Sequence, residues 1–364
     1  MSARHNSRRD FLRGKAARDV VTDWLDAVPS TLDVSPVETA GRYLISLKRR
    51  AMACDFVVLL NAGQHNAGPT LAMQALDLIE ELEAQLTIYR DSSEVLEINC
   101  TAAERPVVVE ERLFELLQRA VALHRDTQGA YDITAGPLSK AWGFFRRQGE
   151  VPNEAALAEA LAKVGSEKLT LDAERQTIAL AQPGVELNLG AIGKGYALDR
   201  CAELLLEGGV DNFLIHGGQS SILARGARAT GRPDEQGWSI SIGDPLRPGK
   251  SMLEFPVVDR AVGTSGTQFQ FFRHAGERYG HIIDPRTGWP AKGVLSCTVL
   301  APTAAEADAL STAFFILGPE GAEAYCAARP ETAALLVCPS NKPGEPIVHR
   351  FNWASVELAK PPND

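Results

Sequence analysis

The sequence has no run of about 20 apolar residues, no CxxC pair, and no basic stripe with interleaved aromatic residues. Without the apolar run, no transmembrane segment is expected. Without CxxC pairs, neither a zinc site nor a disulfide framework is expected, and the six cysteines are predicted to be buried small apolar residues. A net charge of −9 at pH 7 and the missing basic stripe argue against nucleic-acid binding.

What is present is the composition of a globular protein. The chain has 364 residues, of which 45% are hydrophobic and 23% are charged, enough for a well-buried core. Strand-like and helix-like segments both occur in runs, without the strict alternation of a doubly wound parallel sheet. We therefore predict an α+β fold with mixed β-sheets and packed helices. No fixed-period repeat is apparent.

The amino-terminal part reads differently from the rest. Residues 1–45 are predicted to be a polar extension, and residues 46–355 a single domain. The start NSRRDFLRG resembles a twin-arginine export signal, with Arg8, Arg9, Phe11 and Leu12 in the matching places. The next segment carries charges where such a signal needs an apolar region. A cytoplasmic location is therefore favoured, and export stays open.

Periodicity and end signals predict the main elements. Apolar spacing predicts a helix over 68–86, a second over about 110–126, and a third that starts after Asn153 and stops near Gly165. Residues 168–181 are predicted to form a hairpin. Short strands are expected within 55–60, 212–216, 219–224, 238–243, 253–258, 281–285 and 295–301. A late helix is expected from Ala304 to about Leu317, and another from Pro319.

The stretch NLGAIGKGYALD (188–199) places three glycines around Lys194, directly before a predicted helix. Glycine serves where the backbone turns tightly or touches a ligand, and the free N–H groups of a helix N-terminus attract anions. This predicts a phosphate site. The spacing matches neither a P-loop nor a dinucleotide-binding motif. The alternative is a tight turn with a surface lysine.

The helix over 302–318 carries a carboxylate in an apolar setting. Thr303 and Glu306 have the spacing of a capping box, and the helix is apolar on nearly every side, so it should be buried. A buried Asp308 must then be paired, hydrogen-bonded or metal-bound. Thr312 lies one turn further on the same face, which suits Mg²⁺. The alternative is a carboxylate hydrogen-bonded to the backbone.

Three more stretches hold reactive groups. AYDITAGPLSKAWGFF (130–145) sets Asp132 beside Tyr131, and AVGTSGTQFQFF (261–272) sets Thr264 and Ser265 between glycines. GHIIDPRTGWP (280–290) sets His281 on a predicted strand before an Asp-Pro turn. Taken alone, His281 reads more readily as a structural histidine and Asp284 as a turn residue.

Together these stretches resemble the FAD:protein FMN transferase family, the ApbE-like flavin transferases. Seven blocks stand in the family's order over about residues 50–330: DSSEVLEIN, YDITAGPLSKAWGF, LNLGAIGKGYALD, FLIHGGQSSILARG, AVGTSGT, HIIDPRTGWP and EADALSTAFFILG. The resemblance implies the family's ApbE-like, T-fold-like architecture. It also implies that FAD binds with Mg²⁺ and that FMN passes to a Thr or Ser side chain of an acceptor protein, with AMP leaving.

The resemblance also implies roles for particular residues. The implied Mg²⁺ ligands are Asp308, Thr312, Ser311 and the main-chain carbonyl of Ala191. The implied FAD contacts are Met52, Tyr89, Ala130, Tyr131, Asp132, Asn188, Lys194 and the main chain of Ile282. The implied catalytic residues are Asp308, Thr264 and His281, the last as a candidate general base for the acceptor hydroxyl.

Two departures from the family pattern are visible. The family's MGT motif appears as Met52-Ala53-Cys54, and Asn188 stands where an Asp also occurs in the family. Two alternatives to transfer stay open at this point. One is a Mg²⁺-dependent FAD pyrophosphatase, in which water replaces the acceptor hydroxyl. The other is an FAD-binding protein without turnover. The identity of the acceptor and the oligomeric state are not determined by the sequence.

Overall fold

The computed structural model describes residues 43–146, 148–229, 237–266, 271–342 and 344–353. The twin-arginine-like start and nearly all of the predicted 1–45 extension lie outside these residues, so both stay predictions. The predicted end of the domain at residue 355 lies outside them as well.

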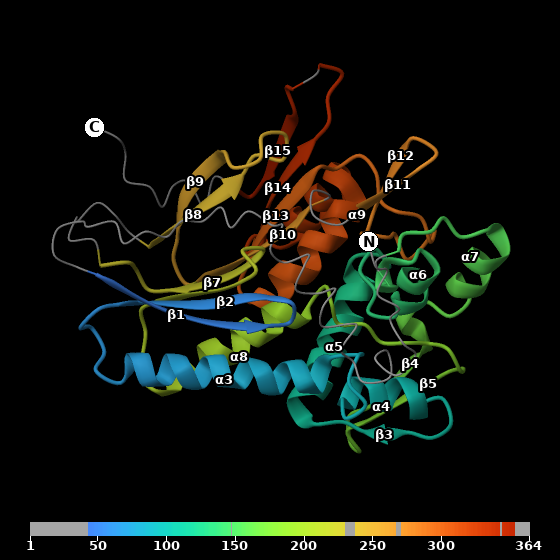
Figure 1. Cartoon of the computed structure of the whole chain (residues 1–364), viewed down its shortest axis with the longest axis horizontal. Coiled ribbons are helices and arrows are strands. Elements are labelled where there is room, and N and C mark those ends of the chain that lie inside the picture. Colours follow the sequence, from blue (N-terminus) through green and yellow to red (C-terminus); the bar gives the residue numbers. More distant parts are fainter. Residues whose placement is uncertain (1–42, 147, 230–236, 267–270, 343, 354–364) are drawn as a thin grey trace, which may run out of the picture. The chain divides into compact units, whose positions relative to one another are not determined.

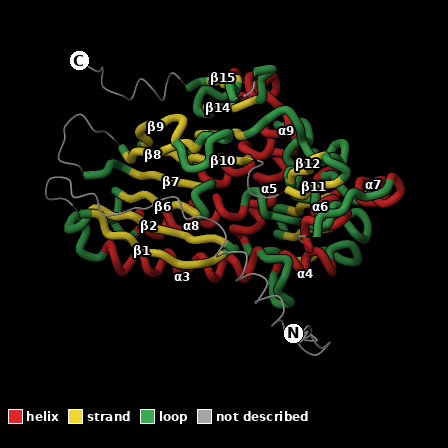
Figure 2. The backbone as a smooth tube through the Cα atoms, turned by 45° about the horizontal axis from the view of Figure 1, so that its top comes forward, coloured by secondary structure: helices red, strands yellow, loops and turns green. Residues whose placement is uncertain are grey.

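The main element is an eight-stranded sheet in which all neighbouring strands pair antiparallel (Figures 1 and 2). The α+β class predicted from the sequence is confirmed. In spatial order its strands are β1 (Leu44–Ala51), β2 (Cys54–Asn61), β6 (Phe213–Gly217), β7 (Ser221–Arg225), β10 (Arg260–Gly266), β13 (Ser296–Ala301), β14 (Ala333–Cys338) and β15 (Ile347–Phe351).

One face of this sheet is covered by helices α3 (Gly68–Leu86), α8 (Gly193–Glu207) and α9 (Ala304–Ala328). The main hydrophobic core lies between them and the sheet. Helix α9 crosses β10 so closely that a Cβ on Gly263 would lie 2.3 Å from the carbonyl oxygen of Ala307. Glycine at this point allows the helix backbone to rest on the strand.

Helix α9 has the start and the break that its sequence predicts. The Thr303 hydroxyl accepts from the N–H of Glu306 at 3.3 Å, which confirms the cap. Gly318 interrupts the helix with φ 72°, and Pro319 begins its second part. The two predicted helices therefore form one kinked element, because a left-handed residue and a proline follow each other there.

The opposite face of the sheet carries a hairpin of β8 (Trp238–Gly243) and β9 (Ser251–Val257). A second, smaller core packs beneath this hairpin. Phe255 meets Trp353 edge to face in it, with ring centroids 5.2 Å apart. Side chains of the sheet therefore point into two different cores, and alternate residues of each strand belong to opposite faces.

The remaining elements form a smaller region beside the helices. Helix α5 (Glu111–Asp126) and the short helix α4 (Glu94–Thr101) lie near the three-stranded sheet of β3 (Val107–Val108), β4 (Leu169–Asp172) and β5 (Thr177–Leu180). Helices α6 (Gly136–Ala141) and α7 (Glu154–Leu161) enclose a third cluster around Trp142. The hairpin of β11 (Phe271–His274) and β12 (Glu277–Gly280) adds Phe272 to this cluster.

One predicted strand is wrong. Residues 281–285 form no strand; the chain turns there, with only an isolated bridge between Ile283 and Pro290. Asp284 accepts from the N–H of Arg286 at 3.0 Å and pairs with its guanidinium. These contacts make Asp284 the turn residue that its sequence setting suggests. The turn replaces the strand because Asp284 satisfies the backbone locally.

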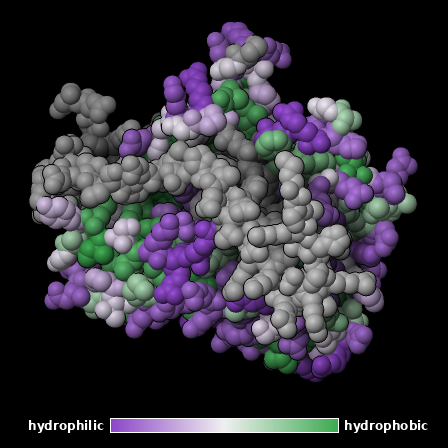
Figure 3. Space-filling view, in the orientation of Figure 1, coloured by the Kyte–Doolittle hydropathy of each residue, from purple (hydrophilic) through white to green (hydrophobic). Residues whose placement is uncertain are grey.

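Most other predictions about elements and cysteines are confirmed. The helices over 68–86, 111–126 and 154–161, the cap at Asn153 and the β4–β5 hairpin are all present. All six cysteines are free, and four are buried as predicted, whereas Cys54 is partly exposed and Cys100 is exposed, so the prediction is wrong for these two. In the described part of the chain, no helix has the length and apolar character needed to cross a membrane. Figure 3 shows mainly hydrophilic side chains on the described surface, between smaller apolar areas.

Candidate active site

The glycine turn and the Asp308 helix meet directly. The N–H of Gly195, in the first turn of α8, donates to Asp308 Oδ2 at 2.7 Å across 113 residues of sequence. A Cβ on Gly195 would lie 2.0 Å from the carbonyl oxygen of Ala304. Glycine is therefore required at position 195, because the backbones of α8 and α9 touch there. The two motifs that carry the implied metal ligands therefore lie side by side.

Asp308 is a buried carboxylate surrounded by neutral hydrogen-bond donors. Its side chain belongs to a residue that is 7% exposed, and Ser221 donates to Oδ1 at 2.6 Å. Burial raises the pKa of Asp308, whereas Lys194 and the bonds from Ser221 and Gly195 act against that rise. The backbone hydrogen bond suggested as an alternative is present. It also attaches the carboxylate to the glycine turn.

A cluster of hydroxyl groups lies beside Asp308. Ser265 Oγ, at the end of β10, is 2.8 Å from Ser311 Oγ and 3.2 Å from Thr312 Oγ1. Ser311 and Thr312 also donate to the main-chain carbonyl of Asp308, at 2.9 and 3.4 Å. The predicted metal ligands of α9 therefore lie together and have a further oxygen, that of Ser265, within reach.

Thr264 points to the other face of the sheet. Its hydroxyl is 3.0 Å from that of Thr298, and the neighbouring Val262 and Leu300 belong to the core under the β8–β9 hairpin. Because side chains alternate along a strand, Ser265 faces α9 and Thr264 does not. The structure does not bring the Thr264 side chain to Asp308, so a catalytic role for it stays a prediction.

The glycine turn differs from the sequence-based hypothesis in one respect. The N–H groups of its three glycines are bonded inside the protein, Gly190 to Asn188 Oδ1 at 2.9 Å, Gly193 to the Leu189 carbonyl at 2.7 Å, and Gly195 to Asp308. These three N–H groups are therefore not free for an anion, and the phosphate site itself stays a prediction. The glycines allow the turn to close on itself and on α9.

Lys194 is the cationic group that the turn presents. It is half-buried, and its Nζ donates to Ser220 Oγ at 2.7 Å, so it is not a freely exposed lysine. Ser220 belongs to the β6–β7 turn, which is held to β10 because the N–H of Thr264 donates to the Ser220 carbonyl at 2.7 Å. Lys194 and Asp308 are therefore bound to two adjacent serines, Ser220 and Ser221.

The β1–β2 turn closes the same end of the sheet. Met52 and Ala53 form a two-residue turn with φ 49° and 59°, a conformation that favours glycine, the residue of the family motif. Burial raises the pKa of the Cys54 thiol to about 11, while Lys194 lowers it and Asp308 raises it. A Cβ on Gly218 would lie 3.0 Å from Cys54 Cβ, so this turn lies against the β6–β7 turn that also carries Ser220.

The 130–134 turn is held from behind by a charged pair. Asp132 accepts from the N–H groups of Thr134 at 2.7 Å and Ser166 at 3.0 Å, and lies 3.0 Å from His124 Nδ1. The Asp132 carboxylate is thus bound to protein groups. The N–H of Asn188 donates to the Ile133 carbonyl at 2.7 Å, which joins this turn to the glycine turn.

His124 and Asp132 provide a prediction about pH. Burial would raise the pKa of Asp132, but hydrogen bonds from His124 and Thr134 outweigh it and lower that pKa. The bond to Asp132 raises the pKa of His124 above its usual 6.5. A raised histidine pKa stabilises the fold below about pH 6.5 and loses that effect as the pH rises. The lowered pKa of Asp132 stabilises the fold above about pH 4, and this stabilisation is lost as the pH falls further.

We expect His124→Asn to cost about 1 kcal/mol more at pH 5.5 than at pH 8.5, because a charge-assisted bond becomes a neutral one. Urea denaturation of the wild type and the variant at both pH values measures this difference. A cost that does not change with pH would show that His124 is neutral in the folded protein at pH 5.5.

Tyr131 and Ile282 lie inside the core next to this region. Tyr131 is 2% exposed, and its hydroxyl has no hydrogen-bond partner among the described residues. Burial, Asp132 and Asp308 all raise its pKa, so it lies within the electrostatic influence of the Asp308 carboxylate. The carbonyl of Ile282 accepts from Ala291 at 2.9 Å. A buried polar group without a protein partner needs an explanation, and a bound water or ligand is one.

Two further predicted site residues are His281 and Tyr89. His281 follows β12 directly and is partly buried. Tyr89 is 68% exposed and stacks on Phe145, with ring centroids 5.1 Å apart. Lys140 lies over the Phe145 ring and pairs with Glu186, two residues before Asn188. The roles of both residues stay predictions.

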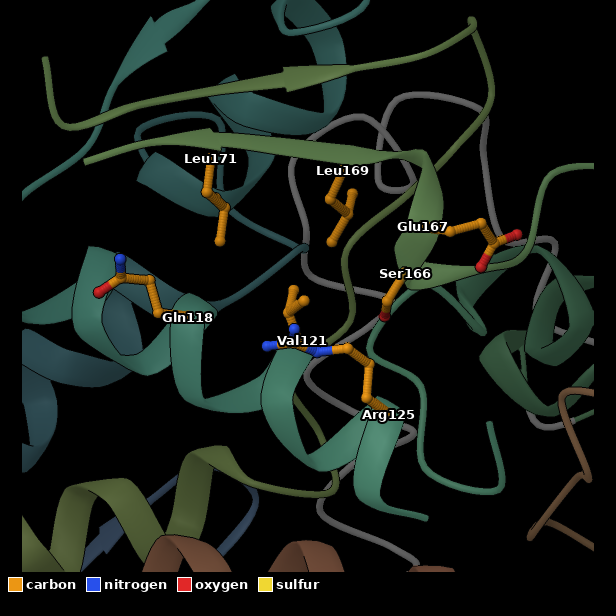
Figure 4. Close-up of a pocket in the computed structure, with 7 residues that line it drawn as sticks. All are labelled: Gln118, Val121, Arg125, Ser166, Glu167, Leu169 and Leu171. Carbon is orange, nitrogen blue, oxygen red and sulfur yellow. The ribbon is translucent and has the colours of Figure 1, made fainter. Parts of the chain in front are cut away.

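The pocket drawn in Figure 4 is lined by residues other than the predicted site residues. It has a volume of about 330 Å³ and is lined by α5, β4 and the 3-10 helix Ser166–Lys168. Ser166 contributes to its wall and also holds Asp132. None of the predicted site residues lines it, so the chemistry of the site is assigned to the Asp308 region instead.

The fold and the site together define the class of the protein. It is an α+β protein with a lysine, a buried carboxylate and several hydroxyl groups at one end of an antiparallel sheet. The family model described as "ApbE family" matches residues 51–336. The chain belongs to the ApbE family.

Curated relatives and solved structures agree with this assignment. The chain is 33% identical to the FAD:protein FMN transferase of Haemophilus influenzae, over 77% of this chain and 82% of the relative, and 35% identical to that of Treponema pallidum, over 74% and 77%. The structure is similar to that of the ApbE protein from Thermotoga maritima, with TM-score 0.76 and 27% identity over 87% of this chain and 99% of that one. For the flavin transferase ApbE from Vibrio cholerae the TM-score is 0.74 and the identity 28%, over 86% and 99%.

The predicted site residues do not include three hydroxyl residues of the site, Ser220, Ser221 and Ser265, although Ser265 was noted beside Thr264 between the glycines. All three stand within the blocks FLIHGGQSSILARG and AVGTSGT, which are among the stretches that carry the resemblance. Serines directly after a glycine-rich turn were the available signal for the first two. For Ser265 the signal was strand alternation, which assigns either Thr264 or Ser265 to the helix side but not both.

Proposed function

We propose that this chain transfers FMN from FAD to a Ser or Thr hydroxyl of an acceptor protein, in a Mg²⁺-dependent reaction that releases AMP. The observation that carries the proposal is the hydrogen bond between Gly195 and Asp308, which brings the lysine-bearing turn and the buried carboxylate to one place. The names of the relatives at 31–35% identity supply the reaction.

The donor set suits Mg²⁺. The proposed ligands are the Asp308 carboxylate, the hydroxyls of Ser311 and Thr312, and the Ala191 carbonyl, all oxygen atoms as Mg²⁺ prefers. The described residues contain no group of three or more His, Cys, Asp or Glu side chains arranged for a metal. A site with a single carboxylate instead leaves positions for water and phosphate oxygens, as is usual for Mg²⁺. When bound, the ion would polarise the phosphoryl group and offset its negative charge.

The protein groups around the diphosphate have distinct tasks. Lys194 would bind the diphosphate as a point charge, exchanging its bond to Ser220 for phosphate oxygens. The acceptor hydroxyl forms a bond to the FMN phosphorus while the bond from that phosphorus to the bridging oxygen breaks, and AMP leaves with that oxygen. The acceptor proton passes to a base, for which His281 is the candidate.

The test uses the purified chain, FAD, Mg²⁺ and a flavoprotein acceptor, with the acceptor's Thr→Ala form as control. We expect AMP release together with a fluorescent covalent flavin on the acceptor, and loss of both after EDTA treatment. AMP and free FMN without an adduct would identify a pyrophosphatase. FAD binding without AMP would identify a binding protein. Turnover that survives EDTA would contradict the Mg²⁺ requirement.

A further inference from the structure

Helices α8 and α9 each carry an aspartate that binds the first turn of the other helix. Asp199 in α8 accepts from the N–H of Ala304 at 2.7 Å through Oδ1 and from that of Ala305 at 2.9 Å through Oδ2. Asp308 in α9 accepts from Gly195 in the first turn of α8 at 2.7 Å. The two helices are therefore joined by a reciprocal pair of carboxylates.

The carboxylate of Asp199 completes the start of α9. The first N–H groups of a helix have no acceptor within it, and the helix dipole favours a negative charge there. Asp199 takes the N–H groups of Ala304 and Ala305, and Thr303 takes that of Glu306 at 3.3 Å. Three successive N–H groups are thus bound, two of them by a residue of another helix. The start of α9 cannot shift along α8 without breaking these bonds.

The position of Asp199 makes it relevant to the site. It lies five residues after Lys194, and its two partners lie three and four residues before Asp308. Between these points the helices are in backbone contact, since a Cβ on Gly195 would lie 2.0 Å from the Ala304 carbonyl oxygen. A shift of α9 would therefore move Asp308 relative to Lys194.

We propose that Asp199 is a positioning residue, whose carboxylate holds α9 against α8 and so sets the place of Asp308 and the affinity of the site for its divalent cation. This inference depends on the proposed function of Asp308 as a cation ligand. Residues that hold a metal ligand in place commonly change metal affinity 10–100-fold when altered.

The surroundings of Asp199 act on its negative charge in both directions. Burial raises its pKa to about 7, and Asp308 adds to the rise, while the bonds from Ala304 and Ala305 and the charge of Arg225 oppose it. Burial thus disfavours the charged form of Asp199, whereas its two backbone hydrogen bonds favour that form. An asparagine places an NH2 group where one of the two carboxylate oxygens stands, and that group cannot accept the N–H that the oxygen binds.

The test compares Asp199→Asn with a matched control, Asp172→Asn. Asp172 also accepts from two backbone N–H groups, those of Glu174 and Arg175 at 3.0 Å, but in the β4–β5 hairpin. In the Asp199 variant we expect the Mg²⁺ concentration for half-maximal AMP release from FAD to rise about 10-fold or more. At saturating Mg²⁺ the KM for FAD should be unchanged. The control should behave as the wild type does.

Two further readouts do not depend on turnover. Hydrogen exchange should quicken at Ala304 and Ala305 in the Asp199 variant, and the rise in Tm that Mg²⁺ causes in the wild type should require more Mg²⁺. If the asparagine variant does not fold, Asp199→Ser, which keeps one acceptor in a smaller side chain, takes its place.

The outcomes separate the inference from the proposed function. A lower Tm with an unchanged Mg²⁺ requirement would make Asp199 merely structural and overturn the inference. A wild type that neither turns over FAD nor gains Tm with Mg²⁺ would overturn the proposed function and the inference with it. Mg²⁺-dependent turnover in the wild type, with an unaltered Mg²⁺ requirement in the variant, would overturn the inference alone.

Discussion

Asp308→Asn is expected to lower FMN transfer by about 1000-fold while the protein stays folded. The change removes the single carboxylate of the proposed cation site, and loss of one preorganised electrostatic contact commonly costs 100- to 1000-fold in rate. Asparagine keeps the size of the side chain and one oxygen for Gly195 or Ser221. Steady-state AMP release and in-gel flavin fluorescence of the acceptor measure the effect.

The same variant should be no less stable than the wild type at neutral pH. Burial raises the pKa of Asp308, so the ionised carboxylate disfavours the folded state there and a neutral amide removes that penalty. Function and stability would then change in opposite directions, as is common at active sites. Asp244→Asn is the control, because Asp244 accepts from the N–H of Leu246 at 2.8 Å in a remote loop. Retention of a tenth of the wild-type rate in Asp308→Asn would contradict the assignment.

Gly195→Ala is expected to destabilise the fold by about 3 kcal/mol and to reduce transfer with it. The new methyl would lie 2.0 Å from the Ala304 carbonyl oxygen and 2.6 Å from the Ala305 nitrogen, both backbone atoms that cannot rotate away. The helices must separate, and overpacking of this kind costs up to about 3 kcal/mol or more. The separation would also break the bonds that Asp308 and Asp199 make across the junction.

Gly193→Ala is the matched control, two residues earlier in the same turn. A Cβ there would meet only Leu86 at 3.8 Å and Leu189 at 4.0 Å, which are ordinary contacts. Alanine is also the better helix former, so the change in stability should be at most about 1 kcal/mol. Urea denaturation of the two variants decides between a steric and a general glycine effect. Equal losses in both would contradict the steric account.

Much of the fold could be predicted from the sequence because its signals are local. The cap at Thr303, the break at Gly318-Pro319 and the apolar spacing of 68–86 involve residues within a few positions of one another. The one strand predicted wrongly, over 281–285, failed for a local reason as well. Asp284 accepts from the N–H of Arg286 within the same turn. This local hydrogen bond outweighs the apolar pattern of Ile282 and Ile283.

The candidate site was only partly accessible to sequence reasoning. Lys194, Asp308 and Thr312 could be identified because charged or polar groups in an apolar or glycine-rich setting stand out. The choice between Thr264 and Ser265 could not be made, because a shift of one residue exchanges the two faces of a strand. The orphan hydroxyl of Tyr131 and the bound state of the glycine N–H groups depend on neighbours that the pattern does not show.

The sequence by itself determined the α+β class, the order of the main elements, the family and the residue types of the site. These properties depend on short-range patterns and on motifs that can be compared one by one. Only the tertiary structure decided that Gly195 donates to Asp308, that Ser265 rather than Thr264 faces the helix, and that Asp199 binds the start of α9. Those contacts join segments 46 to 113 residues apart, and they form only when strand register and helix packing bring the partners within hydrogen-bonding distance.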